Sequence, residues 1–187
     1  GAVVTPAVAR ELLRTRVSTA LAEHCEAVAA YAVELVRRWG GEEEEAAVAG
    51  LLHDYCRELG AIETLRRARE LGLRVSRLEK RRPVQLLHAR LAAAELADSG
   101  LSAACLRAIA LHTVGGPRMS VLDKCVYVAD GAAAGRRHEG VERVRAFAAW
   151  SLDDAVRASV RGQLAHLLQQ GEAIHPHTLA LYNELHD

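Results

Sequence analysis

Apolar side chains recur at helical spacing along almost the whole chain, and glycine or proline separates one such stretch from the next. Between Val28 and Trp39, for example, apolar residues return every three or four positions, which is the period of one buried helix face. Half of the residues are apolar, and only four are proline, a composition that favours helices over strands. We therefore expect an all-α fold, and 187 residues suit a single domain with a buried core.

Helix boundaries follow from capping serines and from glycine or proline at the ends of each apolar stretch. The acidic run Glu42–Glu45 suits the first turn of a helix, where negative charge complements the helix dipole. The Arg-rich stretch at 73–82 is expected to be a loop. The helices that we expect lie at about 6–16, 19–39, 42–53, 61–71, 83–99, 103–112, 120–130, 152–170 and from 176 onward.

Charge and cysteine usage limit the class of protein. The 24 basic and 24 acidic residues balance, so no global field favours nucleic acid or a membrane as a partner. No stretch approaches the roughly 20 apolar residues that span a bilayer, and no secretory signal is visible. The four cysteines, without a C-x-x-C pair, are typical of reduced core residues. We expect a cytoplasmic monomer or homodimer that binds neither nucleic acid nor a membrane.

His53 and Asp54 close an apolar helix and are the first two of six candidate metal ligands. The other four also stand at helix ends or on apolar helix faces. They are His24, His88, His112 and Asp130. Imidazoles and carboxylates bind first-row divalent metals, and two carboxylates with four imidazoles are enough for two ions. Because such groups are costly to bury unpaired, the pattern predicts a shared metal site and metal-dependent hydrolysis.

Each of these residues also has a simpler interpretation. A lone histidine on an apolar helix face is more often a core residue bonded to a backbone carbonyl, and Asp130 is also suited to cap a loop. The dipeptide itself is weak evidence, since His186-Asp187 repeats it at the C-terminus, where we assign it no role. Arg57, one helical turn after Asp54, suits either a phosphate contact or an exposed surface. Convergence of all six candidate ligands on one cleft would favour the metal site.

Three local strings resemble the HD-domain metal-dependent phosphohydrolases, and among them the symmetrical bis(5'-nucleosyl)-tetraphosphatases. The strings are Gly50-Leu-Leu-His-Asp-Tyr-Cys-Arg57, His112-Thr-Val-Gly-Gly-Pro-Arg-Met-Ser-Val-Leu-Asp-Lys124 with Tyr127-Val-Ala-Asp130, and Ile174-His-Pro-His-Thr178. The resemblance extends from about Glu23 to Leu185. It implies a single HD-domain helical bundle over 1–187, with a metal-binding core at about 18–135 and helices at 141–187 that close a nucleotide site.

The resemblance also implies an activity, a cofactor and roles for particular residues. The implied reaction is cleavage of diadenosine tetraphosphate into two ADP, with iron, as one or two ions, as the cofactor. Manganese, cobalt, nickel and zinc suit the same ligands. The implied core metal ligands are His24, His53, Asp54 and Asp130. The positions implied for a second metal or the phosphates are His88 and His112. The implied catalytic residues are His53, Asp54 and Arg57.

A nucleotide site is implied around the same residues and the C-terminal string. Its implied members are Asp54, Tyr55, Cys56, Arg57, His88, His112, Thr113, Arg136, Ala173, Ile174, His175, Pro176, His177 and Thr178. This chain departs from the family between Asp130 and Arg136, where it has Gly-Ala-Ala-Ala-Gly instead of a Tyr-Ile-Glu-Pro-type stretch. Two alternatives therefore stay open. One is an HD-type nucleotidase or nucleoside triphosphohydrolase that acts on mononucleotides, and the other is a nucleotide-binding sensor with little turnover.

Overall fold

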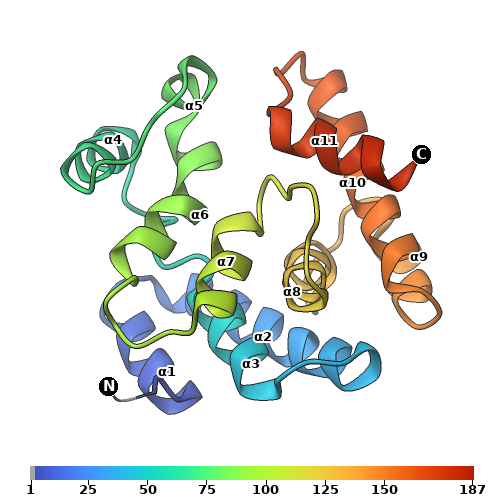
Figure 1. Cartoon of the computed structure of the whole chain (residues 1–187), viewed down its shortest axis with the longest axis horizontal. Helices are drawn as coiled ribbons and strands as arrows, with labels where there is room; N and C mark the ends of the chain where they lie inside the picture. The colour runs from blue at the N-terminus through green and yellow to red at the C-terminus, as the bar shows by residue number, and fades with distance from the viewer. Residues whose placement is uncertain (1–2) are drawn as a thin grey trace.

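Eleven helices and no strand make up residues 3–187, the part of the chain that the computed structural model describes (Figure 1). The helices are α1 (Pro6–Arg14), α2 (Thr19–Trp39), α3 (Glu43–Leu52), α4 (Ala61–Glu70), α5 (Arg77–Arg81), α6 (Pro83–Glu95), α7 (Ala103–Leu111), α8 (Val121–Ala132), α9 (Val141–Ala148), α10 (Leu152–Gln169) and α11 (Pro176–Leu185). The all-α expectation is confirmed. The first two residues of the expected domain 1–187 lie outside the described residues. None of the described helices is long and apolar enough to cross a membrane.

The centre of the fold is the packing of α2 against α3 and of α8 against both. A glycine allows the closest of these approaches, because a Cβ added at Gly50 in α3 would lie 2.5 Å from the Cα of Ala29 in α2. Around this contact the core is filled by buried aliphatic residues such as Val28, Leu51 and Val126. The close approach brings the C-terminal end of α3, where His53 and Asp54 follow, beside the middle of α2.

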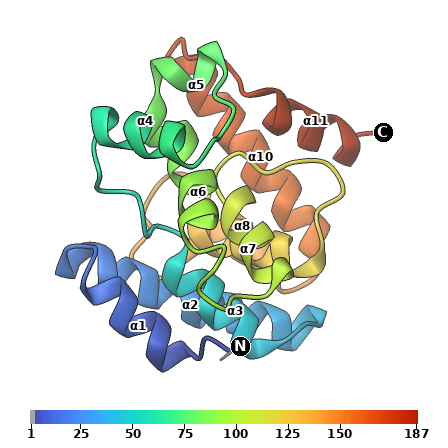
Figure 2. The same ribbon diagram turned by 60° about the vertical axis from the view of Figure 1, so that its left-hand side comes forward.

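Two groups of helices flank α8 on opposite sides, as Figure 1 shows. On one side α6 and α7 pack together, with α4 and α5 beyond them against α6. On the other side α10 packs on both α8 and α9, and α11 packs on α10. Seen from the side in Figure 2, α5 approaches the turn between α10 and α11. An ion pair joins the groups there, Arg82 with Glu172 at 3.5 Å, and His175 lies 3.8 Å from the Glu79 carboxylate.

Two helices were not expected from the sequence. The prediction of a loop throughout 73–82 is wrong, because Arg77–Arg81 forms the short helix α5. Its stability is local, since the Ser76 side chain accepts from the Glu79 backbone N–H while the Glu79 carboxylate accepts from the Ser76 N–H. The second, α9, follows Gly140 and buries only Val141, Val144 and Ala148, too few apolar positions for a clear periodic signal.

The ends of other helices differ from expectation by a few residues. Helix α6 ends at Glu95, well before Gly100, and α8 continues past Gly131 to Ala132. In α10 the apolar residues spaced by four do not all face the core, because each step turns about 40° further around the helix. Leu152 and Leu164 are therefore nearly buried, with 7% and 9% exposure, whereas Leu168 is 65% exposed.

The four cysteines are buried and free, as expected for reduced core residues. Burial raises the pKa of the Cys105 and Cys125 thiols to about 12 and that of Cys25 to about 11. The thiolate is therefore a minor species near neutral pH, which argues against a cysteine nucleophile.

Candidate metal centre

The structure brings all six predicted metal ligands together at the middle of the fold. They come from five helices. His24 lies in α2, His53 and Asp54 follow α3, His88 lies in α6, His112 caps the C-terminal end of α7, and Asp130 lies in the last turn of α8. One ligand atom from each of His24, His53, Asp54 and Asp130 falls within 4.8 Å of the others, and the same is true of Asp54, His88 and His112.

Asp54 belongs to both clusters, because its two oxygens face opposite ways. Its Oδ2 lies 3.3 Å from Nε2 of His53 and 3.6 Å from Nε2 of His24. Its Oδ1 lies 3.2 Å from Nε2 of His88 and 3.3 Å from Nε2 of His112. A carboxylate in this position is suited to bridge two cations, one on each side.

The Asp130 carboxylate completes the first cluster. Its Oδ1 lies 3.2 Å from Nε2 of both His24 and His53. Two carboxylates and two imidazoles thus surround one point, and one carboxylate and two imidazoles surround the other.

Backbone carbonyls orient the three most buried imidazoles. The Nδ1 contacts are 2.6 Å from His53 to the Gly50 carbonyl, 2.6 Å from His88 to that of Val84, and 2.7 Å from His112 to that of Ile109. A carbonyl oxygen only accepts, so each Nδ1 carries a proton and donates it. In the neutral imidazole, Nε2 then presents a lone pair to the cluster, which is the arrangement of a metal-ligating histidine.

The Nε2 atoms fit a metal better than they fit one another. Those of His88 and His112 are 3.0 Å apart, and two lone pairs at that distance repel unless a proton or a metal lies between them. His53 Nε2 is buried and makes no hydrogen bond. Ligands at right angles on a metal about 2.1 Å away are about 3.0 Å apart, which matches the spacing of these groups.

The charges of the cluster favour a cation. Burial disfavours ionisation of Asp54 and Asp130, but the surrounding histidines outweigh it and hold the pKa of both carboxyls well below the usual range. In turn, these carboxylates overcome burial and raise the pKa of His53. Burial lowers the pKa of His88, so that imidazole is neutral near pH 7. Two negative charges beside imidazole nitrogens favour a divalent metal, which would replace the proton held by His53.

Comparison with known proteins agrees with this geometry, since residues 21–135, more than half of the chain, match the HD domain family. The chain belongs to the HD domain family. Over 181 residues and 95% of each chain it is 30% identical to the symmetrical bis(5'-nucleosyl)-tetraphosphatase of Halalkalibacterium halodurans. The symmetrical bis(5'-nucleosyl)-tetraphosphatase of Bacillus subtilis is 30% identical over 167 residues, which cover 82% of this chain and 83% of that one.

A solved structure is similar over nearly the full length. It is that of a predicted HD superfamily hydrolase involved in NAD metabolism from Clostridium acetobutylicum, with a TM-score of 0.92, 26% identity and 98% coverage of each chain. The similarity includes the helices beyond residue 135, which flank the part that matches the HD domain.

In this HD domain the metal-ligand cluster opens into a cavity of about 260 Å³. Its lining consists of Asp54, Arg57, Gln85, His88, Thr113, Asp130 and Arg136. Arg57 and Arg136 supply positive charge at the rim, which suits a phosphate beside the metal ligands. Gln85 is the one lining residue that the sequence does not point to, and its position one helical turn before His88 is the only signal for it.

Arg136 is tied to the metal-ligand cluster. Its Nη2 lies 3.2 Å from Oδ1 of Asp130 and 3.4 Å from Nε2 of His24, and its Nε donates to the Asp130 backbone carbonyl. Lys124 behaves differently, since its ammonium pairs with Asp153 at 2.7 Å on the surface. Of these two basic residues, Arg136 therefore lies beside the candidate metal ligands and Lys124 does not.

The C-terminal segment 173–178 contacts Val114, the residue after Thr113, and spans from the core to the surface. Thr178 is buried and donates to the Val114 carbonyl at 2.7 Å, and Ile174 packs on the core. His175 faces Glu79 of α5, while its Nδ1 accepts from the backbone N–H of His177. The remaining members of the segment, Ala173, Pro176 and His177, are exposed.

The two residues that follow Asp54 point elsewhere. The Tyr55 ring lies under the Arg16 guanidinium, 4.3 Å from its carbon, and Cys56 is fully buried, 3.8 Å from the same guanidinium. Neither side chain lines the cavity beside the metal ligands. Arg57, one residue further, does line it.

Proposed function

We propose that this protein hydrolyses diadenosine tetraphosphate symmetrically into two ADP, with iron or another divalent transition metal as cofactor. The observation that carries the proposal is the position of Asp54, whose two oxygens each face a separate pair of imidazoles beside an arginine-lined cavity. The choice of substrate rests on the names of the relatives in Halalkalibacterium halodurans and Bacillus subtilis.

In this proposal, His24, His53, Asp54 and Asp130 hold one cation, and Asp54, His88 and His112 hold a second. The chemistry that such cations supply when bound is a water of lowered pKa and a polarised phosphoryl group. The water oxygen forms a bond to one inner phosphorus atom, and the bridging oxygen leaves with the other ADP. Hydrolysis of a phosphoanhydride depends mainly on positioning and on neutralising charge, which fits a site built from ligands and arginines.

The residues around the metal ligands would hold the substrate. Arg57 and Arg136 both line the cavity and would donate to phosphate oxygens. Thr113 and the segment 173–178 would hold one nucleoside diphosphate, so that the helices at 141–187 close the site over the metal-binding core at about 18–135.

The decisive experiment is separation of the products after reaction with diadenosine tetraphosphate. The purified protein is analysed for bound metal and then assayed with Fe²⁺, Mn²⁺ or Co²⁺. Two ADP per substrate support the proposal. ATP with AMP, release of inorganic phosphate from mononucleotides alone, or ADP binding without turnover would each contradict it.

Arg57→Ala separates substrate handling from metal binding. We expect it to keep the bound metal and to lower kcat/KM by roughly 10- to 100-fold, because a charge-assisted contact to phosphate is lost. The matched control is Arg161→Ala, at an exposed position in α10, which should leave both unchanged.

A further inference from the structure

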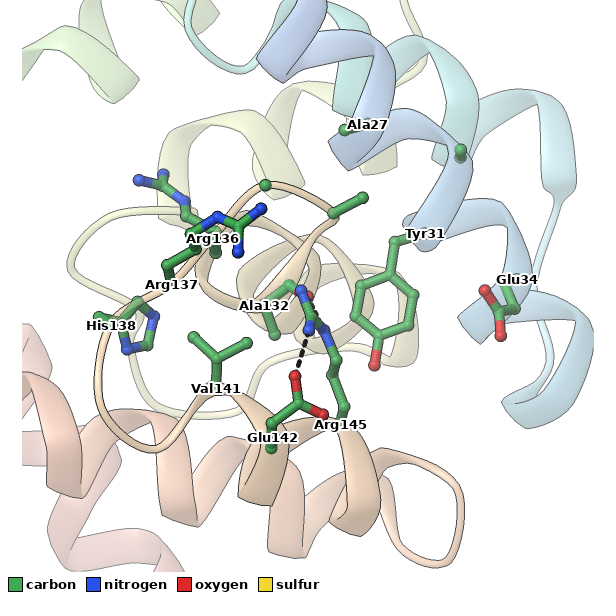
Figure 3. A pocket seen from close by; sticks show the side chains of 13 residues that line it. Ala27, Tyr31, Glu34, Ala132, Arg136, Arg137, His138, Val141, Glu142 and Arg145 are labelled. Atoms are coloured by element: carbon green, nitrogen blue, oxygen red, sulfur yellow. Dashed lines mark hydrogen bonds and ion pairs between the residues drawn. The ribbon is translucent and has the colours of Figure 1, made fainter.

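A second and larger cavity, of about 830 Å³, lies between α2, the end of α8 and α9 (Figure 3). Small residues make up part of its lining. Those small residues are Ala27 and Ala30 of α2 with Ala132, Ala134 and Gly135 at the end of α8 and after it. The last of these belong to the Gly-Ala-Ala-Ala-Gly stretch at 131–135, where the chain departs from the family pattern.

This α2–α9 cavity is next to the metal-ligand cluster. Arg136 lines both the cavity beside the metal ligands and the α2–α9 cavity. Asp130 lines the first and Ala132, two residues later in α8, lines the second. A ligand that passes Arg136 would therefore extend from one cavity into the other.

The α2–α9 cavity has the groups that recognise a nucleotide. Tyr31 of α2 is partly buried, and its ring borders the cavity in Figure 3, where a base would stack on it. The Arg137 side chain extends over the cavity and has no hydrogen bond or ion pair with any residue among 3–187. The Arg145 guanidinium, by contrast, donates to the carbonyls of Ala132 and Ala133 and forms part of the cavity wall.

We propose that the α2–α9 cavity binds the second nucleoside diphosphate half of a dinucleoside polyphosphate. This inference rests on the proposed function, because symmetrical cleavage places two equal halves on opposite sides of the broken bond. One half would bind at the segment 173–178, as proposed above. The other half would pass Arg136 and enter the α2–α9 cavity, with its base against Tyr31 and its phosphate near Arg137.

The first test is the number of ADP molecules that the Mn²⁺-loaded protein binds, measured by isothermal titration calorimetry. We expect two per chain in the wild type. Ala30→Trp fills the α2–α9 cavity from an exposed helix position and should bind one. Ala165→Trp, the same change at an exposed position of α10, should still bind two. One or no ADP in the wild type, or two in Ala30→Trp, would overturn the proposal; circular dichroism checks that each variant is folded.

The second test compares two substrates. Tyr31→Ala should lower kcat/KM for diadenosine tetraphosphate about 10-fold and leave that for adenosine 5'-tetraphosphate, which lacks the second nucleoside and so has no base to place on Tyr31, unchanged. Tyr31→Phe should restore most of the loss, since it keeps the aromatic ring. Equal effects on both substrates, or none, would contradict the assignment. If the wild-type protein bound two ADP but did not hydrolyse diadenosine tetraphosphate, the proposed function would be wrong, whereas the α2–α9 cavity would still be a nucleotide-binding site.

Discussion

At the scale of single residues, Asp54 decides whether there is a metal centre, because both ligand clusters contain it. Asp54→Asn keeps the shape of the side chain but removes its charge and replaces one oxygen with a donor. We expect bound metal and hydrolysis both to fall more than about 10-fold. Elemental analysis beside the product assay measures the two losses. Asp153→Asn, which changes an exposed partner of Lys124, is the control and should keep both; normal metal content in Asp54→Asn would refute the role of Asp54.

The sequence predicts the candidate ligands well and the lining of the cavity less well. The six ligands stand at helix ends or on apolar helix faces, where the fold must turn them inward, and all six converge as predicted. Side-chain direction in the turn after α3 depends on tertiary contacts, so sequence alone does not reveal that Arg16 holds Tyr55 and Cys56 away from the cavity. The sequence also does not predict the α2–α9 cavity, because its lining residues are distant in sequence and its alanines carry no functional group that would mark a site.

At the scale of helices, the close approach of α2 and α3 places His53 beside His24. Gly50→Ala would put a Cβ 2.5 Å from the Cα and 2.7 Å from the N of Ala29, and backbone atoms cannot move aside easily. We expect a loss of about 3 kcal/mol in the free energy of unfolding, measured by urea denaturation. Gly162→Ala in α10 is the control, since nothing lies within 4 Å there. It should gain about 0.5–1 kcal/mol from helix propensity. Equal stability of Gly50→Ala and the wild type would exclude this close packing.

Glu79 stabilises α5 through its ionised form. Burial opposes ionisation, but hydrogen bonds from Ser76 and the ion pair with Arg90 outweigh it and lower the pKa of Glu79. A lowered pKa in the folded state stabilises the fold above the unfolded value of about 4.3, and this contribution is lost as the pH falls through the folded pKa. Glu79→Gln should therefore cost about 1–3 kcal/mol at pH 7.

The pH dependence provides the check on Glu79. In urea denaturation the difference between Glu79→Gln and the wild type should shrink as the pH falls below about 4. Glu70→Gln, at an exposed partner of Arg66, should differ from the wild type by no more than about 0.5 kcal/mol at any pH. A Glu79→Gln penalty that is the same at pH 3 and pH 7 would show that the charge is not responsible.

Which helices are predictable from the sequence depends on how each is stabilised. Helices such as α2 and α8 bury a full apolar stripe, so their periodicity reveals them. Helix α5 has five residues and depends on the Ser76–Glu79 capping box, while α9 buries a short patch against its neighbours. Their signals are a cap and a preceding glycine, which are weak indicators when the apolar period is missing.

At the scale of the whole molecule, the candidate metal centre is the point where α6 and α7 meet the core helices α2, α3 and α8. Its ligands come from α2, α3, α6, α7 and α8, so one or two cations would join five helices that are distant in sequence. The group of α9, α10 and α11 contributes none of the six ligands; α9 and α10 pack on α8, which carries Asp130, and Thr178 of α11 donates to the Val114 carbonyl. The proposed metal ligands and the helices proposed to close the nucleotide site thus lie in different parts of the chain.

Metal should therefore stabilise the entire fold. A cation that binds only the folded state, present at 100 times its Kd, adds about 2.7 kcal/mol. For a chain of 187 residues this raises Tm by roughly 5–10 °C. We expect that increase when Mn²⁺ is added to EDTA-treated, dialysed protein and thermal unfolding is followed by circular dichroism. Asp54→Asn should show no increase, because both clusters lose their shared carboxylate. If the wild type melted at the same temperature with and without Mn²⁺, the six side chains would not form a metal site that binds the folded chain.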